Sequence, residues 1–77
     1  MDGNSTIGNV TSIIMQSVDS LGDTVQTTIN RLYFYPNPDA TYNQVDTAIR
    51  ALISLSANTY KDTICVTNIS VSEVLAG

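Results

Sequence analysis

Two prolines, Pro36 and Pro38, divide the chain into segments with different hydrophobic patterns. Proline lacks a backbone N–H and restricts the residue before it, so a β-strand that reaches this point must end. Before the prolines, apolar and polar residues alternate over 24–35, which is typical of a strand. After them, apolar residues recur every three or four positions, which is typical of a helix. The chain is therefore expected to combine both kinds of element.

The segment after the prolines carries clear helix signals. Thr41-x-x-Gln44 is a capping-box pattern, in which the two side chains bind free backbone N–H groups of the first turn. The apolar stripe behind it consists of Val45, Ala48, Ile49, Leu52, Ile53 and Leu55. This pattern predicts a helix over about 42–56. Asn58 is expected in its C-terminal cap region, because asparagine tolerates the left-handed conformation.

The segment before residue 22 is ambiguous. Apolar residues from Ile7 to Leu21 recur at helical steps, but the segment is rich in Thr, Ser, Val and Ile, which favour strands. We favour a hairpin with a strand over about 10–19, a turn centred on Gly22 and a second strand over 24–35. An N-terminal helix over 7–21 is the alternative.

The two ends of the chain complete the prediction. Residues 63–71 have the composition of a third strand, which in one version continues to Leu75. Residues 1–9 are mostly small and polar and are expected to form an extended arm. The predicted fold class is α+β: a small ββαβ domain over 10–77, with a three-stranded sheet, one packed helix and an N-terminal extended arm.

The helix segment resembles a known family. The run Ala40-Thr41-x-x-Gln44-Val45, followed by Ala51-Leu52-x-Ser54-Leu55-Ser56, is similar to the helix of short, uncharacterised bacterial domains. In that family a glycine turn precedes the helix, as Leu21-Gly22-Asp23 does here, and the last strand closes on a leucine, here Leu75. The Lys-Pro pair usual after the turn glycine is missing. The resemblance spans about residues 10–75 and implies a strand-strand-helix-strand fold without an assigned activity.

The composition excludes several classes of protein. The 77 residues include seven acidic and three basic side chains, no His, no Trp and one Cys. Three basic residues cannot supply the footprint of a nucleic-acid binder, and one Cys cannot build a disulfide or zinc scaffold. No apolar run approaches the roughly 20 residues of a membrane span. No targeting segment stands out, so localisation stays open: an extracellular filament or a virion if the chain assembles, otherwise the cytoplasm.

The residues that could carry chemistry favour structural roles. Nucleophilic catalysis needs a base beside the nucleophile, and Cys65, flanked by Ile64 and Val66, is expected to be a buried thiol. Asp19 and Asp23 bracket the turn but lack the spaced acidic run of a calcium loop. We therefore predict no catalytic, cofactor-binding or metal-ligating residues, no enzymatic activity, no cofactor and no small-molecule substrate.

Geometry favours protein partners. One helix covers one face of a three-stranded sheet, and apolar residues fall on both faces of the later strands. The low charge gives little defence against self-association. The polar arm is a further candidate for contact with another copy, because it can join the edge of a sheet as an added strand. The predicted interface residues are Ile7, Val10, Ile14, Met15, Leu32, Phe34, Tyr35 and Ile69.

Two hypotheses follow for function. The first is a non-enzymatic structural subunit that assembles with copies of itself, as a filament, fibre or virion component, through the sheet face and strand addition. The alternative is a small soluble adaptor or inhibitor, possibly phage-encoded, that uses the same face to bind a different protein.

Overall fold

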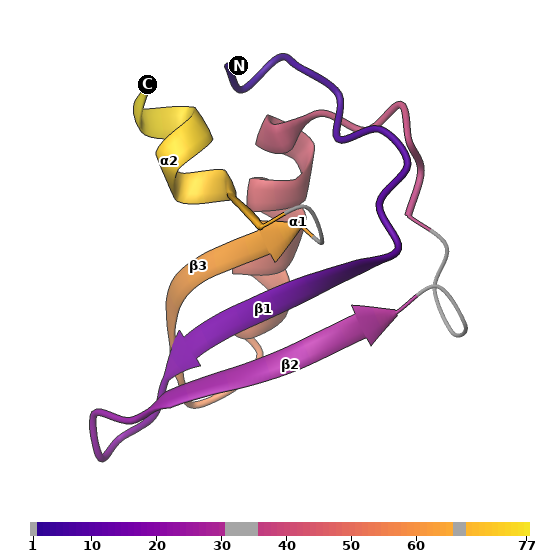
Figure 1. The fold of residues 1–77 in the computed structure, drawn as a ribbon. Helices are drawn as coiled ribbons and strands as arrows, with labels where there is room; N and C mark the ends of the chain where they lie inside the picture. The colour runs from indigo at the N-terminus through magenta and orange to yellow at the C-terminus, as the bar shows by residue number, and fades with distance from the viewer. Residues whose placement is uncertain (1, 31–35, 66–67) are drawn as a thin grey trace.

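The computed structural model describes residues 2–30, 36–65 and 68–77. The elements are β1 (Ser12–Val18), β2 (Thr24–Asn30), α1 (Tyr42–Ile53), β3 (Thr59–Cys65), β4 (Ile69–Ser70) and α2 (Val71–Ala76). The strands form one antiparallel sheet in the order β2-β1-β3-β4, and α1 lies behind it in the view of Figure 1. The α+β class is confirmed, with a fourth short strand and a second helix in addition to the predicted elements.

The N-terminal half forms the predicted hairpin, not the alternative helix. β1 and β2 pair from Ser12↔Asn30 to Val18↔Thr24. Asp19 shapes the turn, because its Oδ1 accepts the backbone N–H groups of Leu21 and Asp23, each at 2.9 Å. Gly22 has a φ of 84°, a region that side chains with a Cβ disfavour. The predicted extension of the second strand over 31–35 lies outside the described residues.

The start of α1 is fully capped. Thr41 Oγ1 accepts the Gln44 N–H at 3.2 Å, and Gln44 Oε1 accepts the Thr41 N–H at 2.8 Å, which confirms the capping box. The two backbone N–H groups between these residues donate to the N-terminal segment. The Tyr42 N–H donates to the Ser5 carbonyl at 3.1 Å, and the Asn43 N–H donates to the Gly3 carbonyl at 2.9 Å. The N–H groups that a helix start leaves free are thereby satisfied.

The end of α1 differs from the prediction. The helix ends at Ile53 with Ser54 as its C-cap, three residues before the expected end. Asn58 does not cap it; its side-chain amide donates to Ser17 Oγ at 3.2 Å and ties the following loop to the end of β1.

Replacing Thr41 with alanine is expected to lower the free energy of unfolding by about 1 kcal/mol, because the N-cap hydroxyl is lost. Urea denaturation followed by circular dichroism measures the change. Thr47→Ala is the matched control, since Thr47 is exposed in the middle of α1 and alanine has the higher helix propensity. Equal losses of stability in the two variants would contradict the capping role.

The core lies between the sheet and α1 and includes part of the arm. Its buried apolar residues are Ile7, Val10, Ile13, Tyr42, Val45, Ile49, Ile53, Cys65, Val71 and Val74. The Ile7 N–H donates to the Ala40 carbonyl at 2.8 Å, and the Gly8 N–H donates to the Pro38 carbonyl at 3.1 Å. Residues 2–10 are therefore packed against the domain, whereas the sequence analysis placed an arm over 1–9 outside it.

The C-terminal part also departs from the prediction. The third strand runs over Thr59–Cys65 and not over 63–71. Asn68 has a φ of 61°, the left-handed conformation of a tight turn, and only Ile69 and Ser70 then pair back onto β3. Ser70 caps α2 by accepting the Glu73 N–H on its hydroxyl at 3.3 Å.

Candidate interface

The outer edge of β2 is open. β2 is the last strand of the sheet, and no described residue outside β1 pairs with it. Its sequence, TVQTTIN, contains no charged residue and no proline, and Thr24 through Thr28 are exposed. In an antiparallel sheet, half of the N–H and C=O groups of a last strand point away from its neighbour. An uncharged edge of this kind readily pairs with another strand.

The opposite edge of the sheet is protected. β4 is only two residues long and continues directly into α2. β3 carries a register irregularity in its pairing with Gln16 and Ser17 of β1, and its Asp62 carboxylate binds Ser70 and Ser72 beside this edge. Short strands, bulges and charges are the usual means by which proteins prevent edge pairing. Of the two edges of the described sheet, only the β2 edge lacks all of them.

An apolar groove lies beside β2 on the helix side of the sheet. The register places Val25, Thr27 and Ile29 opposite Ser17, Met15 and Ile13, so they share the face that carries α1. The helix covers this strand incompletely, because Val25 is 38% exposed and Leu52 of α1 is 45% exposed. The groove has a volume of about 570 Å³, and its apolar lining includes Ile7, Ile13, Ile29, Ala48, Ile49 and Leu52.

The other face of the sheet is more polar than expected. By register its side chains include Ser12, Ile14, Gln16 and Val18 of β1, Thr24, Gln26 and Thr28 of β2, Thr59, Asp62 and Ile64 of β3, and Ser70 of β4. Ile14 lies opposite both Thr28 and Ile64, and Lys61 Nζ donates to Thr24 Oγ1 at 2.9 Å. The described part of this face therefore combines a small apolar centre with hydroxyl, amide and charged side chains. Leu32 and Phe34, on which the expectation of an apolar bare face also rests, lie outside the described residues.

The predicted interface residues fall into three groups. Ile7 and Val10 are buried in the core of their own chain, and the half-buried Met15 and Ile69 pack against it. Ile14 lies half-buried on the open face. Leu32, Phe34 and Tyr35 lie outside the described residues. The sequence analysis did not single out β2 as an open edge, although its uncharged sequence was the available signal.

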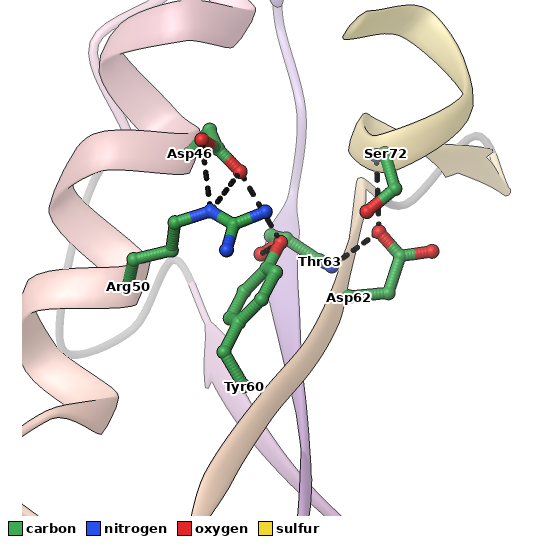
Figure 2. A network of polar contacts seen from close by, with 6 residues as sticks. All are labelled: Asp46, Arg50, Tyr60, Asp62, Thr63 and Ser72. Atoms are coloured by element: carbon green, nitrogen blue, oxygen red, sulfur yellow. Dashed lines mark hydrogen bonds and ion pairs between the residues drawn. The ribbon is translucent and has the colours of Figure 1, made fainter. Parts of the chain in front are cut away.

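A polar network joins α1 to β3 (Figure 2). Arg50 Nε donates to Asp46 Oδ1 at 2.9 Å, and the guanidinium carbon lies 4.2 Å from the centre of the Tyr60 ring. Tyr60 Oη lies 3.0 Å from Thr63 Oγ1 and 3.5 Å from Asp46 Oδ1. Burial raises the pKa of the Tyr60 hydroxyl, an effect that its hydrogen bonds to Thr63 and Ser72 only partly offset. The tyrosine is therefore a neutral hydrogen-bonding group, which supports a structural role.

Asp62 fixes α2 to the sheet. Its Oδ2 accepts the Ser70 hydroxyl at 2.5 Å, and its Oδ1 accepts the N–H groups of Ser72 at 3.1 Å and Thr63 at 2.7 Å. Burial by itself would raise the pKa of this carboxyl, but these hydrogen bonds to the charged form outweigh it and the pKa lies below its ordinary value. Asp62 is therefore a clamp on the start of α2.

The clamp predicts an acid-sensitive stability. A carboxyl whose pKa is lower in the folded chain stabilises the fold above its unfolded pKa, about 4, and loses this contribution as the pH falls further. Unfolding free energies measured from pH 6 to pH 2 should decline less steeply below pH 4 in Asp62→Asn than in the natural chain. Asp39→Asn, at an exposed position, is the control. Parallel declines for the natural chain and Asp62→Asn would contradict the clamp.

The remaining chemistry-bearing residues take structural positions. The Cys65 side chain is fully buried, and burial raises the pKa of its thiol. Within residues 2–30, 36–65 and 68–77, no group of three or more His, Cys, Asp or Glu side chains could hold a metal ion. In the same residues, no helix has the length and apolar character needed to cross a membrane.

Comparison with known protein families, curated proteins and solved structures found no match. The resemblance to the short bacterial domains therefore stays a prediction.

Proposed function

We propose that this chain is a non-enzymatic structural subunit that associates with copies of itself through the outer edge of β2. The observation that carries the proposal is the contrast between the two edges of the sheet. β2 is exposed, uncharged and unpaired on its outer side among the described residues, whereas the β3–β4 edge is short, irregular and charged. A second strand is the partner that satisfies the free backbone groups of such an edge.

The arm has no part in this association. Its backbone groups bind residues 38–43 of the same chain, and Ile7 is buried beneath them. Strand addition by the arm would require breaking these bonds and exposing Ile7. Pairing through β2 requires no rearrangement, which is why we now propose this edge in place of the arm.

The proposal is tested by the molar mass of the full chain in sedimentation equilibrium over a wide concentration range. The natural chain is expected to associate. Thr28→Lys places a charge on the open edge at an exposed position and should raise the dissociation constant at least tenfold. Thr47→Lys, with the same change on the exposed side of α1, should behave like the natural chain. A natural chain that stays monomeric at the highest concentration would overturn the proposal.

The apolar groove beside β2 favours one alternative. An edge strand bordered by a groove also fits an extended segment of a different protein, as in an adaptor or inhibitor. Affinity purification with the natural chain and with Thr28→Lys distinguishes the two functions. One foreign protein retained in stoichiometric amount by the natural chain, lost with Thr28→Lys and accompanied by no self-association, would support the adaptor.

A further inference from the structure

We infer that the association is a closed twofold dimer in which the β2 strands of two copies run antiparallel, with Thr27 of one copy opposite Thr27 of the other. This inference rests on the proposed function and adds the geometry and the size of the assembly.

The symmetry follows from the use of one edge by both copies. When the same strand pairs with itself, the contact is isologous and a twofold axis relates the copies. An axis perpendicular to the sheet makes the strands antiparallel and keeps α1 of both copies on the same face. The two sheets then join into one, with the order β4-β3-β1-β2-β2-β1-β3-β4.

The register follows from the pattern of side chains in β2. Residues directly opposite each other in an antiparallel pair lie on the same face of the sheet, so a one-residue slip would oppose the two faces. Full overlap of Thr24–Asn30 with its copy places Val25 opposite the second copy's Ile29 and Gln26 opposite its Thr28. Apolar side chains then meet on the helix side and polar ones on the other face. A shift of two residues loses both Val–Ile pairs.

The sequence of β2 suits a second copy of itself. The strand has no charge, so no like charges meet when it pairs with itself, and its apolar residues are placed symmetrically about Thr27. The partly exposed Val25 gains an apolar neighbour across the seam. The two grooves, each bordered by β2 and α1, lie on the same face on either side of this seam.

The number of copies in the assembly follows from the protection of the β3–β4 edge. Growth into a filament by strand pairing needs two free edges on each subunit. At the β3–β4 edge, β3 has a bulge and the Asp62 carboxylate, and the outer strand is only two residues long and continues into α2. Once β2 is paired, no comparable edge among the described strands is left. The assembly therefore closes at two copies, and the expectation of a filament is narrowed to a dimer that is complete by itself.

A charge-swap experiment tests the register. Thr27→Lys and Thr27→Glu each place like charges directly opposite each other in the dimer, so each variant alone should be monomeric at concentrations where the natural chain is dimeric. An equimolar mixture should restore the dimer, with a dissociation constant at least tenfold below that of either variant. Thr27 is exposed, and circular dichroism checks that both variants are folded.

The same exchange at Thr28 is the matched control. In the proposed register Thr28 lies opposite Gln26, so the charges of mixed Thr28→Lys and Thr28→Glu chains are not directly opposed and mixing should give a much smaller gain. Thr27→Cys gives a second readout, because a glutathione redox buffer should cross-link it to its own copy, whereas Thr28→Cys should cross-link poorly. The natural Cys65 is buried and should give no cross-link.

The outcomes separate the inference from the proposed function. If the natural chain dimerises and Thr28→Lys weakens the dimer, but mixed Thr27 variants stay monomeric and Thr27→Cys does not cross-link, the register is wrong and association through β2 still stands. If the molar mass rises beyond two copies, the closed dimer is wrong. If the natural chain is monomeric throughout, both the inference and the proposed function fail.

Discussion

Replacing Tyr42 with alanine is expected to remove about 3–5 kcal/mol from the free energy of unfolding. Tyr42 is the first residue of α1 and is 2% exposed, among the largest fully buried side chains of the described core. A chain of 77 residues has a total stability of about 4–11 kcal/mol, so this loss is a large part of the whole. The variant should contain a substantial unfolded population at 37 °C.

Thermal and urea unfolding at fixed protein concentration measure this effect. We expect the melting temperature of Tyr42→Ala to fall by roughly 15 °C or more, given the usual relation between free energy and melting temperature at this size. Tyr42→Phe keeps the ring and should lose less than about 1 kcal/mol. A similar loss in both variants would show that the ring does not support the core.

Deleting residues 1–9 is expected to destabilise the domain itself, by about 3–5 kcal/mol, whatever its state of association. The deletion removes Ile7 from the core and leaves the Tyr42 and Asn43 N–H groups of α1 without their acceptors. A donated arm would behave differently: its loss would reduce the molar mass and leave the helix intact.

Circular dichroism and sedimentation on the truncated chain distinguish a destabilised domain from the loss of a donated arm. The helical signal and the unfolding midpoint should both fall. Ile7→Ala should reproduce much of the loss, whereas Thr6→Ala, at an exposed side chain whose backbone makes the bridge to Thr41, should change stability by less than about 0.5 kcal/mol. A truncated chain with full stability but a lower molar mass would restore the idea of a donated arm.

The elements with local signals could be predicted from the sequence. Thr41 and Gln44 indicate the start of α1, because a capping box depends on two residues three positions apart. The four-residue spacing of Val45, Ile49 and Ile53 indicates the buried face of the helix. The hairpin followed from strand-favouring residues around Gly22. A similar local signal precedes α2, because Ser70-x-x-Glu73 has the capping-box spacing and Ser70 caps that helix.

The tertiary features could not be predicted in the same way. Nothing in the polar composition of residues 2–9 shows that their carbonyls meet the start of α1, because that contact depends on where the helix lies after folding. The order of the strands, which makes β2 the open edge, is likewise set by long-range pairing of β1 with β3. The sequence therefore predicts contacts through a sheet face and through strand addition, but not which edge of the sheet is open.

The first described residues and α2 lie close together, above the sheet in the view of Figure 1. A Cβ added to Gly3 would lie 2.7 Å from Leu75 Cδ2, so the backbone near one terminus packs directly on the helix that ends at the other. A short linker could join them, and new termini opened at the exposed Gly22 turn would give a circular permutant with the same contacts. Fluorophores or fusion proteins attached before residue 2 or after Gly77 would project from the same side of the domain.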